Sequence, residues 1–252
     1  MFIFASKMTI DFEHQKNKYS FDTQNGLNIT IPIKKSGNVN CYFLDNPLFQ
    51  YFENDAFSGN LSNGGSVNCE KISFYPHASG THTECALHVY PVSFTMLDIK
   101  MPIFQLGLLK SFVPTENNNE FCITREQILE IQNKEQAEVI ILRTLPNDSF
   151  KLNKDYSDTN PPFISPEAIL VLKEKGFKHI VTDLPSIDKE SDGGKLLSHK
   201  TWFKDVDFNH NTITELVFID NEIKDGLFVV NIQMPKIETD AVPSNIILYP
   251  CV

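Results

Sequence analysis

The sequence predicts one domain of the α/β or α+β class, and three observations support this prediction. Short apolar runs typical of buried strands alternate with segments that carry helix-capping signals. The chain contains no internal repeat and no low-complexity tract that would divide it. Its 252 residues, 41% of them hydrophobic, are also enough for one sizeable core. We therefore expect one main domain over residues 27–252, preceded by an N-terminal arm over residues 1–26.

The first part of the chain carries few regular patterns. Residues 1–26 are polar and weakly patterned, which indicates an arm or an edge element. LNITIPI, residues 27–33, has the β-branched alternation of a strand. Residues 34–66 are rich in Asn, Gly, Ser and aromatic residues and predict a long loop system, which in a compact enzyme usually has a function. Its aromatic residues either line a pocket or belong to the core.

Beyond residue 120 the chain alternates between strand and helix signals. Thr124 and Gln127 form a capping box at the start of a helix. Residues 137–144 are a continuous apolar run, as expected of a strand buried on both faces. Ser165 and the proline after it begin a second helix, which stops at a glycine. The remaining expected elements are a strand in 177–183, a helix near 194–203, and strands in 212–220, 226–234 and 244–250.

Charge and composition exclude several classes of function. A formal net charge of -10 argues against nucleic acid and anionic membrane surfaces as partners, because both need a concentrated positive face. No apolar run approaches the roughly 20 residues that span a bilayer, and the N-terminus lacks the features of a secretory signal. The five cysteines are odd in number and have no C-x-x-C spacing. We therefore expect a cytoplasmic protein with reduced thiols that binds small molecules.

A histidine cluster stands out in PHASGTHTECALH, residues 76–88, which holds three of the seven histidines and a carboxylate. Residues two apart in a strand share one face, so His82, Glu84 and His88 would line the same side. Imidazole nitrogens together with a carboxylate suit a divalent metal ion. His77 has the opposite parity and would join them only through a bulge. The plainer alternative is that these histidines are ordinary surface or core residues.

Two distant residues offer further polar groups. Glu215 lies in an apolar row of a predicted strand, where burying its carboxylate is costly unless a cation compensates it. At a sheet edge it would merely be solvated. His199 lies near an apolar stretch and indicates little by itself.

GTHTE, followed by His88, resembles the H-x-G-T-H-x-D-x-P-x-H signature of the cyclase family of metal-dependent hydrolases, which includes bacterial kynurenine formamidase and isatin hydrolase. Ordered blocks over residues 27–250 extend the likeness: LNITIPI, VIILRT, PPFISPEAILVLKEKGFKHIVTD, DLPSIDKESDGGKLLSH and the C-terminal segment from ELVFID. The resemblance implies a swivelling β/β/α fold with a mixed sheet flanked by helices. It also implies a homodimer or homotetramer.

The resemblance also implies a site. Glu84 stands where the family usually has Asp and would touch both ions of a two-metal centre, while His88 matches the histidine assigned to general acid/base work. Asp183, Ser186 and Asp188 form a tight turn, or else support His199 from outside the ligand set. The implied metal ligands are His82, Glu84, His199 and Glu215.

The chain departs from the family pattern at two positions. Ala78 replaces the first ligand histidine, and His77 lies one place too early, so His77 is a candidate ligand or second acid/base. Ala86 replaces a proline, which loosens a turn and removes no chemistry.

The function implied is hydrolysis of a small aryl-formamide by metal-activated water, with N-formylkynurenine, cleaved to kynurenine and formate, as the leading substrate. One alternative is ring opening of a cyclic amide, lactam or isatin-like substrate. The other is a metal- or small-ligand-binding protein without turnover, which the missing histidine at 78 leaves open. One or two ions are expected, with Zn²⁺ preferred and Mn²⁺ as the alternative. Tyr42, Phe43 and Phe49 are candidates to stack on an aromatic amide.

Overall fold

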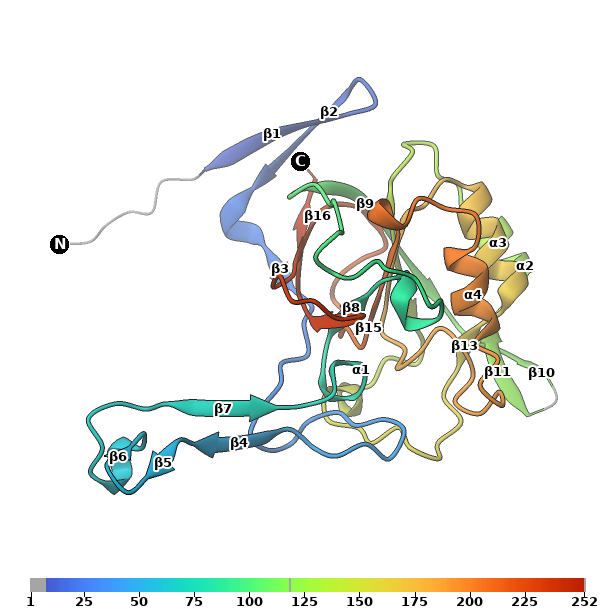
Figure 1. Cartoon of the computed structure of the whole chain (residues 1–252). Helices are drawn as coiled ribbons and strands as arrows, with labels where there is room; N and C mark the ends of the chain where they lie inside the picture. Colours follow the sequence, from blue (N-terminus) through green and yellow to red (C-terminus); the bar gives the residue numbers. More distant parts are fainter. Residues whose placement is uncertain (1–7, 118, 252) are drawn as a thin grey trace.

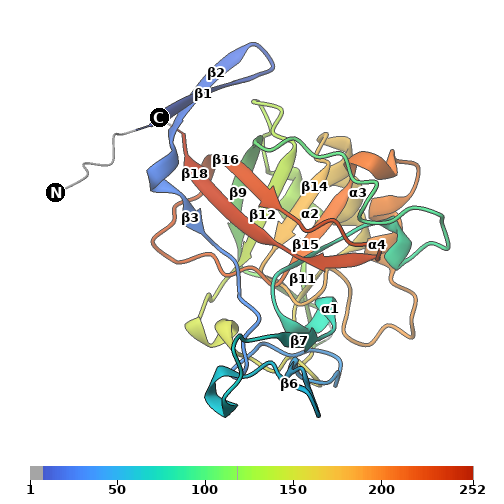
Figure 2. The same ribbon diagram turned by 60° about the vertical axis from the view of Figure 1, so that its left-hand side comes forward.

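A nine-stranded mixed sheet forms the centre of the computed structural model, which describes residues 8–117 and 119–251 (Figures 1 and 2). Four neighbouring strands at its middle are parallel, and the strands on either side run antiparallel to them. In spatial order the strands are β17 (Ala241–Pro243), β8 (His82–Glu84), β15 (Thr212–Glu215), β14 (His179–Thr182), β12 (Val139–Thr144), β9 (Gln105–Phe112), β16 (Gly226–Gln233), β18 (Asn245–Pro250) and β3 (Leu27–Asn28).

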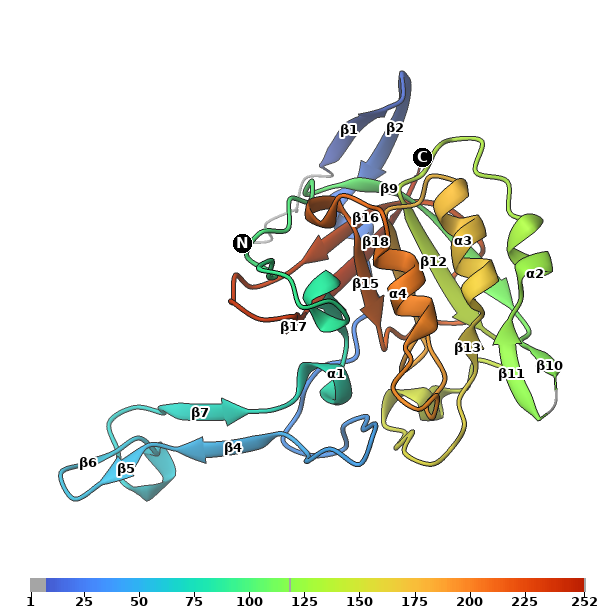
Figure 3. The same ribbon diagram turned by 45° about the vertical axis from the view of Figure 1, so that its right-hand side comes forward.

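Three helices cover one face of this sheet (Figure 3). They are α2 (Arg125–Leu129), α3 (Pro166–Glu174) and α4 (Leu197–Phe203). The capping box at the start of α2 is confirmed, since both of its hydrogen bonds are present. At α3 the Ser165 hydroxyl accepts a hydrogen bond from the Ala168 amide at 3.2 Å, and Gly176 ends the helical segment with φ +84°. The helix signals in the sequence are therefore confirmed at both ends.

The other face is covered by the sheet itself, because the sheet curls strongly (Figure 2). Side chains of β16 and β18 pack in one apolar cluster with those of β12 and β14, although these strands are not all neighbours in the sheet. All six residues of β12 are buried, which confirms the predicted strand with two covered faces. The expectation of an α/β domain with a mixed sheet is thus confirmed, with helices on one face only.

Two expected strands are shorter than their patterns predict. Of residues 27–33 only the first two belong to β3, because the Asn28 side chain accepts a hydrogen bond from the Thr30 amide and turns the chain. Of residues 212–220 only the first four belong to β15. Leu216 has φ +56°, which breaks the alternation directly after Glu215.

Residues 48–73 form an arm of paired strands that projects from the domain (Figure 1). Part of this arm lies within residues 34–66, which were predicted to be a long loop system. Strands β4 (Leu48–Tyr51) and β7 (Glu70–Ser73) pair antiparallel, and β5 (Glu53–Asn54) and β6 (Phe57–Ser58) continue toward the tip. The loop prediction was wrong for strands β4 to β6, because the Asn- and Gly-rich tip dominates the composition of the segment. The alternating pattern of its flanks is too short to outweigh that signal.

The smaller elements complete the chain. Residues 9–22 of the expected N-terminal arm form a hairpin of β1 (Thr9–His14) and β2 (Asn17–Asp22), and its Phe21 is buried against Phe104. Strands β10 (Thr115–Asn117), β11 (Glu120–Ile123) and β13 (Phe163–Ile164) form a small sheet beside the helices. In the described part of the chain, no helix is long and apolar enough to cross a membrane.

Candidate metal centre

The histidine cluster lies on α1 (Pro76–Ser79) and on β8, which follows it directly. Thr81 fixes this connection, because its hydroxyl accepts a hydrogen bond from the Ile31 amide at 2.7 Å and donates one to the Leu216 carbonyl. A Cβ at Gly80 would lie 2.8 Å from the Ile31 carbonyl oxygen, so only glycine allows this close approach. The GT pair of the signature thus holds the chain in place just before His82.

The pairing of β8 with β15 brings two distant parts of the sequence together. His82 lies opposite Glu215 in this register, and its Nε2 is 3.4 Å from the Glu215 carboxylate. The other ring nitrogen of His82 lies 3.1 Å from the Gly80 carbonyl oxygen. Both side chains are almost completely buried. A solvated edge carboxylate, the alternative left open for Glu215, is therefore wrong.

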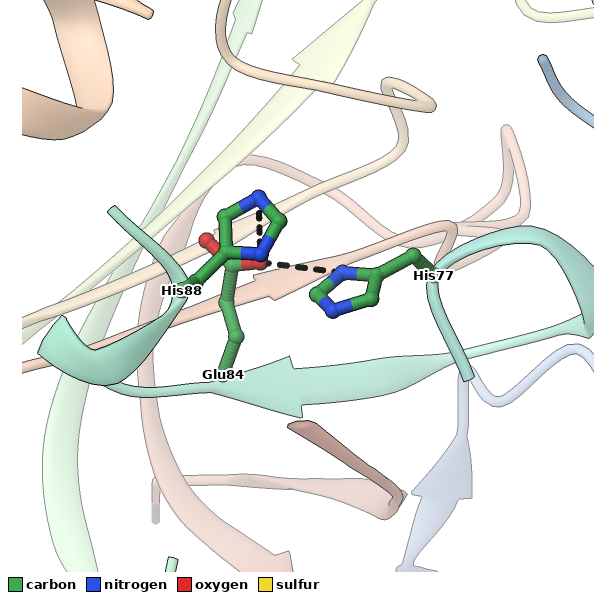
Figure 4. Close-up of side chains that lie close together, drawn as sticks. All are labelled: His77, Glu84 and His88. Carbon is green, nitrogen blue, oxygen red and sulfur yellow. Dashed lines mark ion pairs between the residues drawn. The ribbon is translucent and has the colours of Figure 1, made fainter. Parts of the chain in front are cut away.

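Glu84 lies at the centre of the cluster and is fully buried. One of its oxygens is 2.8 Å from His199 Nε2. The other is 3.2 Å from His77 Nδ1 and 3.8 Å from His88 Nε2, as Figure 4 shows for the three residues that it labels. Three imidazoles therefore surround a single carboxylate.

His199 is held in place by Asp188. The Asp188 carboxylate lies 2.7 Å from His199 Nδ1 and accepts hydrogen bonds from the backbone amides of Ser198 and His199 in the first turn of α4. This contact orients the ring so that Nε2 faces Glu84 and Glu215. Of the two roles left open for Asp188, the structure therefore provides support of His199 from outside the ligand set.

His77 reaches the cluster from a helical turn, whereas the sequence analysis required a bulge in a strand. Successive residues of a helix point about 100° apart. His77 therefore faces Glu84, while Ala78 is buried in a separate apolar cluster with Ile31 and Val39. His88 likewise arrives through the 3-10 turn Ala86–His88, because β8 ends at Glu84.

Several buried polar atoms of the cluster have no hydrogen-bond partner within residues 8–117 and 119–251. They are His82 Nε2, His199 Nε2 and both carboxylate oxygens of Glu84. The 2.8 Å contact between Glu84 and His199 is close, yet it lacks hydrogen-bond geometry. Burying such atoms unpaired is costly, whereas a cation beside Glu84 would satisfy the atoms of Glu84 and His82. His199 Nε2 lies outside both of the ligand groups described next. The orphaned atoms of Glu84 and His82 therefore fit a metal ion.

Two groups of side chains could each hold an ion. In each group the candidate ligand atoms lie within 4.8 Å of one another, and Glu84 belongs to both. Nitrogen and oxygen donors of this kind suit borderline divalent cations such as zinc. The groups are His77, Glu84 and His88, and His82, Glu84 and Glu215.

The charge of the cluster also suits a cation. Burial alone would raise the pKa of Glu84, but His88 and His199 hold it well below the ordinary value. Burial and the Glu84 charge likewise oppose ionisation of Glu215, while His199 and His82 lower its pKa overall. Both carboxylates are thus anionic near neutral pH, as metal ligands must be.

Asp240 is a site residue that the sequence analysis missed. One of its carboxylate oxygens lies 2.9 Å from His77 Nε2 and 3.2 Å from His88 Nδ1. Hydrogen bonds from these histidines keep the pKa of Asp240 well below its usual value. Asp240 precedes β17, which pairs with β8 so that Ala241 lies opposite Glu84. No local sequence pattern predicts the pairing of β17 with β8, because the two strands lie about 150 residues apart in the sequence.

A cavity of about 560 Å³ opens onto the cluster. Of the three aromatic residues expected there, Tyr42 lines it, while Phe43 is 78% exposed and Phe49 lies on the arm. Tyr42 and Phe43 have φ values of 60° and 55°, and this left-handed pair turns the second ring outward. The lining also includes Leu44, His77, His88, Ser186, His199, Glu215 and residues of the segment 189–196.

The sequence matches one protein-family model and several solved structures. The family model, described as "Putative cyclase", covers residues 8–189. A "predicted metal-dependent hydrolase" from Bacillus stearothermophilus is 19% identical, with a TM-score of 0.60 over 89% of this chain and 97% of that one. An isatin hydrolase bound to the product analogue thioisatinate is 12% identical, with a TM-score of 0.63 over 89% and 92%. Isatin hydrolase A from Labrenzia aggregata is 14% identical, with a TM-score of 0.61 over 89% and 93%.

No curated protein matches the sequence. At these identities the solved structures establish the fold, and the family match covers more than half of the chain. It agrees with the resemblance carried by GTHTE and the blocks after it. The chain therefore belongs to the cyclase family.

Proposed function

We propose that this protein is a metal-dependent amidohydrolase that acts on a small aryl-formamide. The observation that supports it best is the position of Glu84, a buried carboxylate shared by two groups of candidate ligands. The solved structures with the same fold include a predicted metal-dependent hydrolase and isatin hydrolases. When bound, a divalent ion would supply Lewis-acid polarisation of the substrate carbonyl and lower the pKa of water. Zn²⁺ is the first choice, with Mn²⁺ as the alternative, and one or two ions would be held.

His88 is proposed as the general acid/base. Its Nδ1 is engaged by Asp240, so Nε2 is left for the reacting groups beside Glu84. Nε2 would take a proton from the attacking water and return it to the departing aryl amine. An imidazole ring can accept a proton and later donate it, so one side chain can do both.

His77 is proposed to replace the histidine that the family has at position 78. Asp240 engages its Nε2, which leaves Nδ1 facing Glu84 at 3.2 Å. One carboxylate thus selects the free nitrogen of both His77 and His88.

The substrate proposal is tested with N-formylkynurenine. Protein loaded with Zn²⁺, or in parallel with Mn²⁺, is expected to release formate and kynurenine, and both products can be assayed directly. The runner-up is ring opening of a cyclic amide or isatin-like substrate, which isatin itself tests without formate release. Metal-loaded protein that hydrolyses neither compound, nor any other aryl amide, would disprove the amidohydrolase proposal.

Asp240→Asn should lower kcat/KM by about 10- to 100-fold, the range for residues that orient ligands from outside the ligand set. The amide keeps the shape of the carboxylate but replaces the anionic oxygen that both His77 and His88 contact with a neutral group. Metal affinity, measured by competition with a chromogenic chelator, should fall in the same variant. Asp11→Asn, on the N-terminal hairpin, is the matched control. Kinetics and metal affinity equal to those of the control would rule out this role.

We also propose that the protein assembles as a homodimer or homotetramer, as the resemblance implied. An isolated two-stranded hairpin is marginally stable in water. The arm nevertheless leaves Leu48, Phe52 and Ile72 about half exposed. A second copy of the chain packing on the arm would cover them. Phe52→Ser combined with Ile72→Ser should therefore lower the mass measured by light scattering, whereas Phe150→Ser, outside the arm, should not.

A further inference from the structure

A second cavity, of about 440 Å³, lies where central strands of the sheet begin. The metal centre lies at the opposite end of these strands. Gln105 and His179 line the second cavity, and each is the first residue of its strand, β9 and β14. Neighbouring β15 begins there with Thr212 and ends at the metal centre with Glu215. The volume is within the usual range for a small-molecule site.

Gln105 is 1% exposed, and neither atom of its amide group has a hydrogen-bond partner among the residues that the structure describes. Buried amides are almost always hydrogen-bonded, because leaving one unpaired costs free energy. Gln105, which lines the cavity, therefore has a free acceptor and free donors. A ligand that carries both a donor and an acceptor would satisfy them.

His179 is 2% exposed, and its Nδ1 lies 3.0 Å from the Thr212 hydroxyl. Burial, together with the nearby Lys178 and His210, lowers the pKa of His179 to about 3, so its ring is neutral near pH 7. When the Thr212 hydroxyl donates to Nδ1, the ring proton is on Nε2. His179 then offers a donor for an acceptor group of a ligand.

The rim of the cavity carries both signs of charge. Lys178 forms an ion pair with Glu138, and Lys100 forms none within the described residues. His210 binds the Lys100 carbonyl through Nδ1, and the exposed Asp207 lies 3.8 Å from its Nε2, outside the lining. The remaining lining residues, Met101 and Pro102, are apolar.

We propose that this cavity binds a free α-amino acid with an apolar side chain. Its carboxylate would accept hydrogen bonds from the Gln105 amide group and the His179 ring and face Lys100. Its ammonium group would donate to the Gln105 carbonyl oxygen and face Glu138. The apolar side chain would contact Met101 and Pro102. The site is separate from the metal centre and does not depend on the hydrolase proposal.

The test uses L-phenylalanine as the probe and the metal-loaded full-length protein. NMR should show shifts of the Gln105 side-chain NH₂ and His179 ring signals on titration to about 10 mM. Two matched analogues separate the charges, since 3-phenylpropanoate lacks the amino group and 2-phenylethylamine lacks the carboxylate. Both should bind more weakly than L-phenylalanine. Binding at this site should persist in Glu84→Gln, even if L-phenylalanine also contacts the metal centre.

Gln105→Leu should weaken binding of L-phenylalanine at least tenfold, because the amide makes the two central hydrogen bonds. The same substitution should raise the melting temperature of the ligand-free protein by about 2–4 °C, since it removes a buried unpaired amide. Gln132→Leu, on an exposed loop, should change neither quantity. Unmoved Gln105 signals, equal binding of all three probes, or full affinity in Gln105→Leu would each overturn the proposal.

Discussion

His88→Ala is expected to lower kcat by about 10²- to 10⁴-fold, the contribution typical of a general acid/base. The His88 side chain is partly exposed at the edge of the cavity, so its removal should not unfold the protein. Metal content, measured by elemental analysis, should stay at the level of the unchanged protein, because Glu84 and its other partners remain in place.

Metal content and kcat together show whether His88 is a metal ligand, a general acid/base or neither. If turnover and metal are lost together, His88 is itself a ligand, a role its place in one candidate ligand group would allow. Unchanged kcat would refute the acid/base assignment. Loss of turnover with metal retained excludes a protein that only binds metal. His14→Ala, on the N-terminal hairpin, controls for a general effect of removing a histidine.

Glu84→Gln is expected to remove metal from both groups at once, because the same carboxylate contributes to each. Affinity should fall by more than the roughly 100-fold that follows loss of a supporting residue outside the ligand set, and hydrolysis should fall with it. Glutamine keeps the volume of the side chain and exchanges a strong anionic ligand for a weak neutral one. Elemental analysis and chelator competition measure the change.

Glu84→Asp is the matched comparison, because aspartate is the usual residue of the family at this position. It keeps the charge and shortens the reach, so it should retain metal where Glu84→Gln does not. Full metal occupancy in Glu84→Gln would show that Glu84 is not the shared ligand. A circular dichroism spectrum and melting temperature for each variant would separate loss of metal from loss of fold.

Local signals in the sequence were sufficient to predict where α2 and α3 begin and that β12 is buried on both faces. The capping box of α2 and the Ser165 cap of α3 act through backbone groups within three residues, so their residue types alone predict the helix starts. The apolar run of β12 likewise reports burial on both faces. Strand β15 ends before Leu216 because this residue has a left-handed φ. The amino-acid composition of the segment does not predict the torsion angle of one residue.

The site was predictable as far as the signature and the family likeness extend. His82, Glu84, His199 and Glu215 were proposed together from the resemblance, and the structure brings them together through the β8–β15 pairing and α4. Asp240 could not be found in this way, because its approach depends on β17 pairing at the far edge of the sheet. Phe43 and Phe49 show the opposite failure. The aromatic composition of residues 34–66 suggested a pocket, but the left-handed backbone at Phe43 leaves its ring exposed, and Phe49 lies on the arm.

The arm begins and ends beside the metal centre. The chain enters it a few residues after Tyr42 and leaves it a few residues before His77, one a wall of the cavity and the other a candidate ligand. A displacement of the arm would therefore pull on both sides of this cavity through a short length of backbone. If a second copy of the chain holds the arm, as proposed above, that subunit contact would also influence the width of the cavity and thereby which substrates fit it.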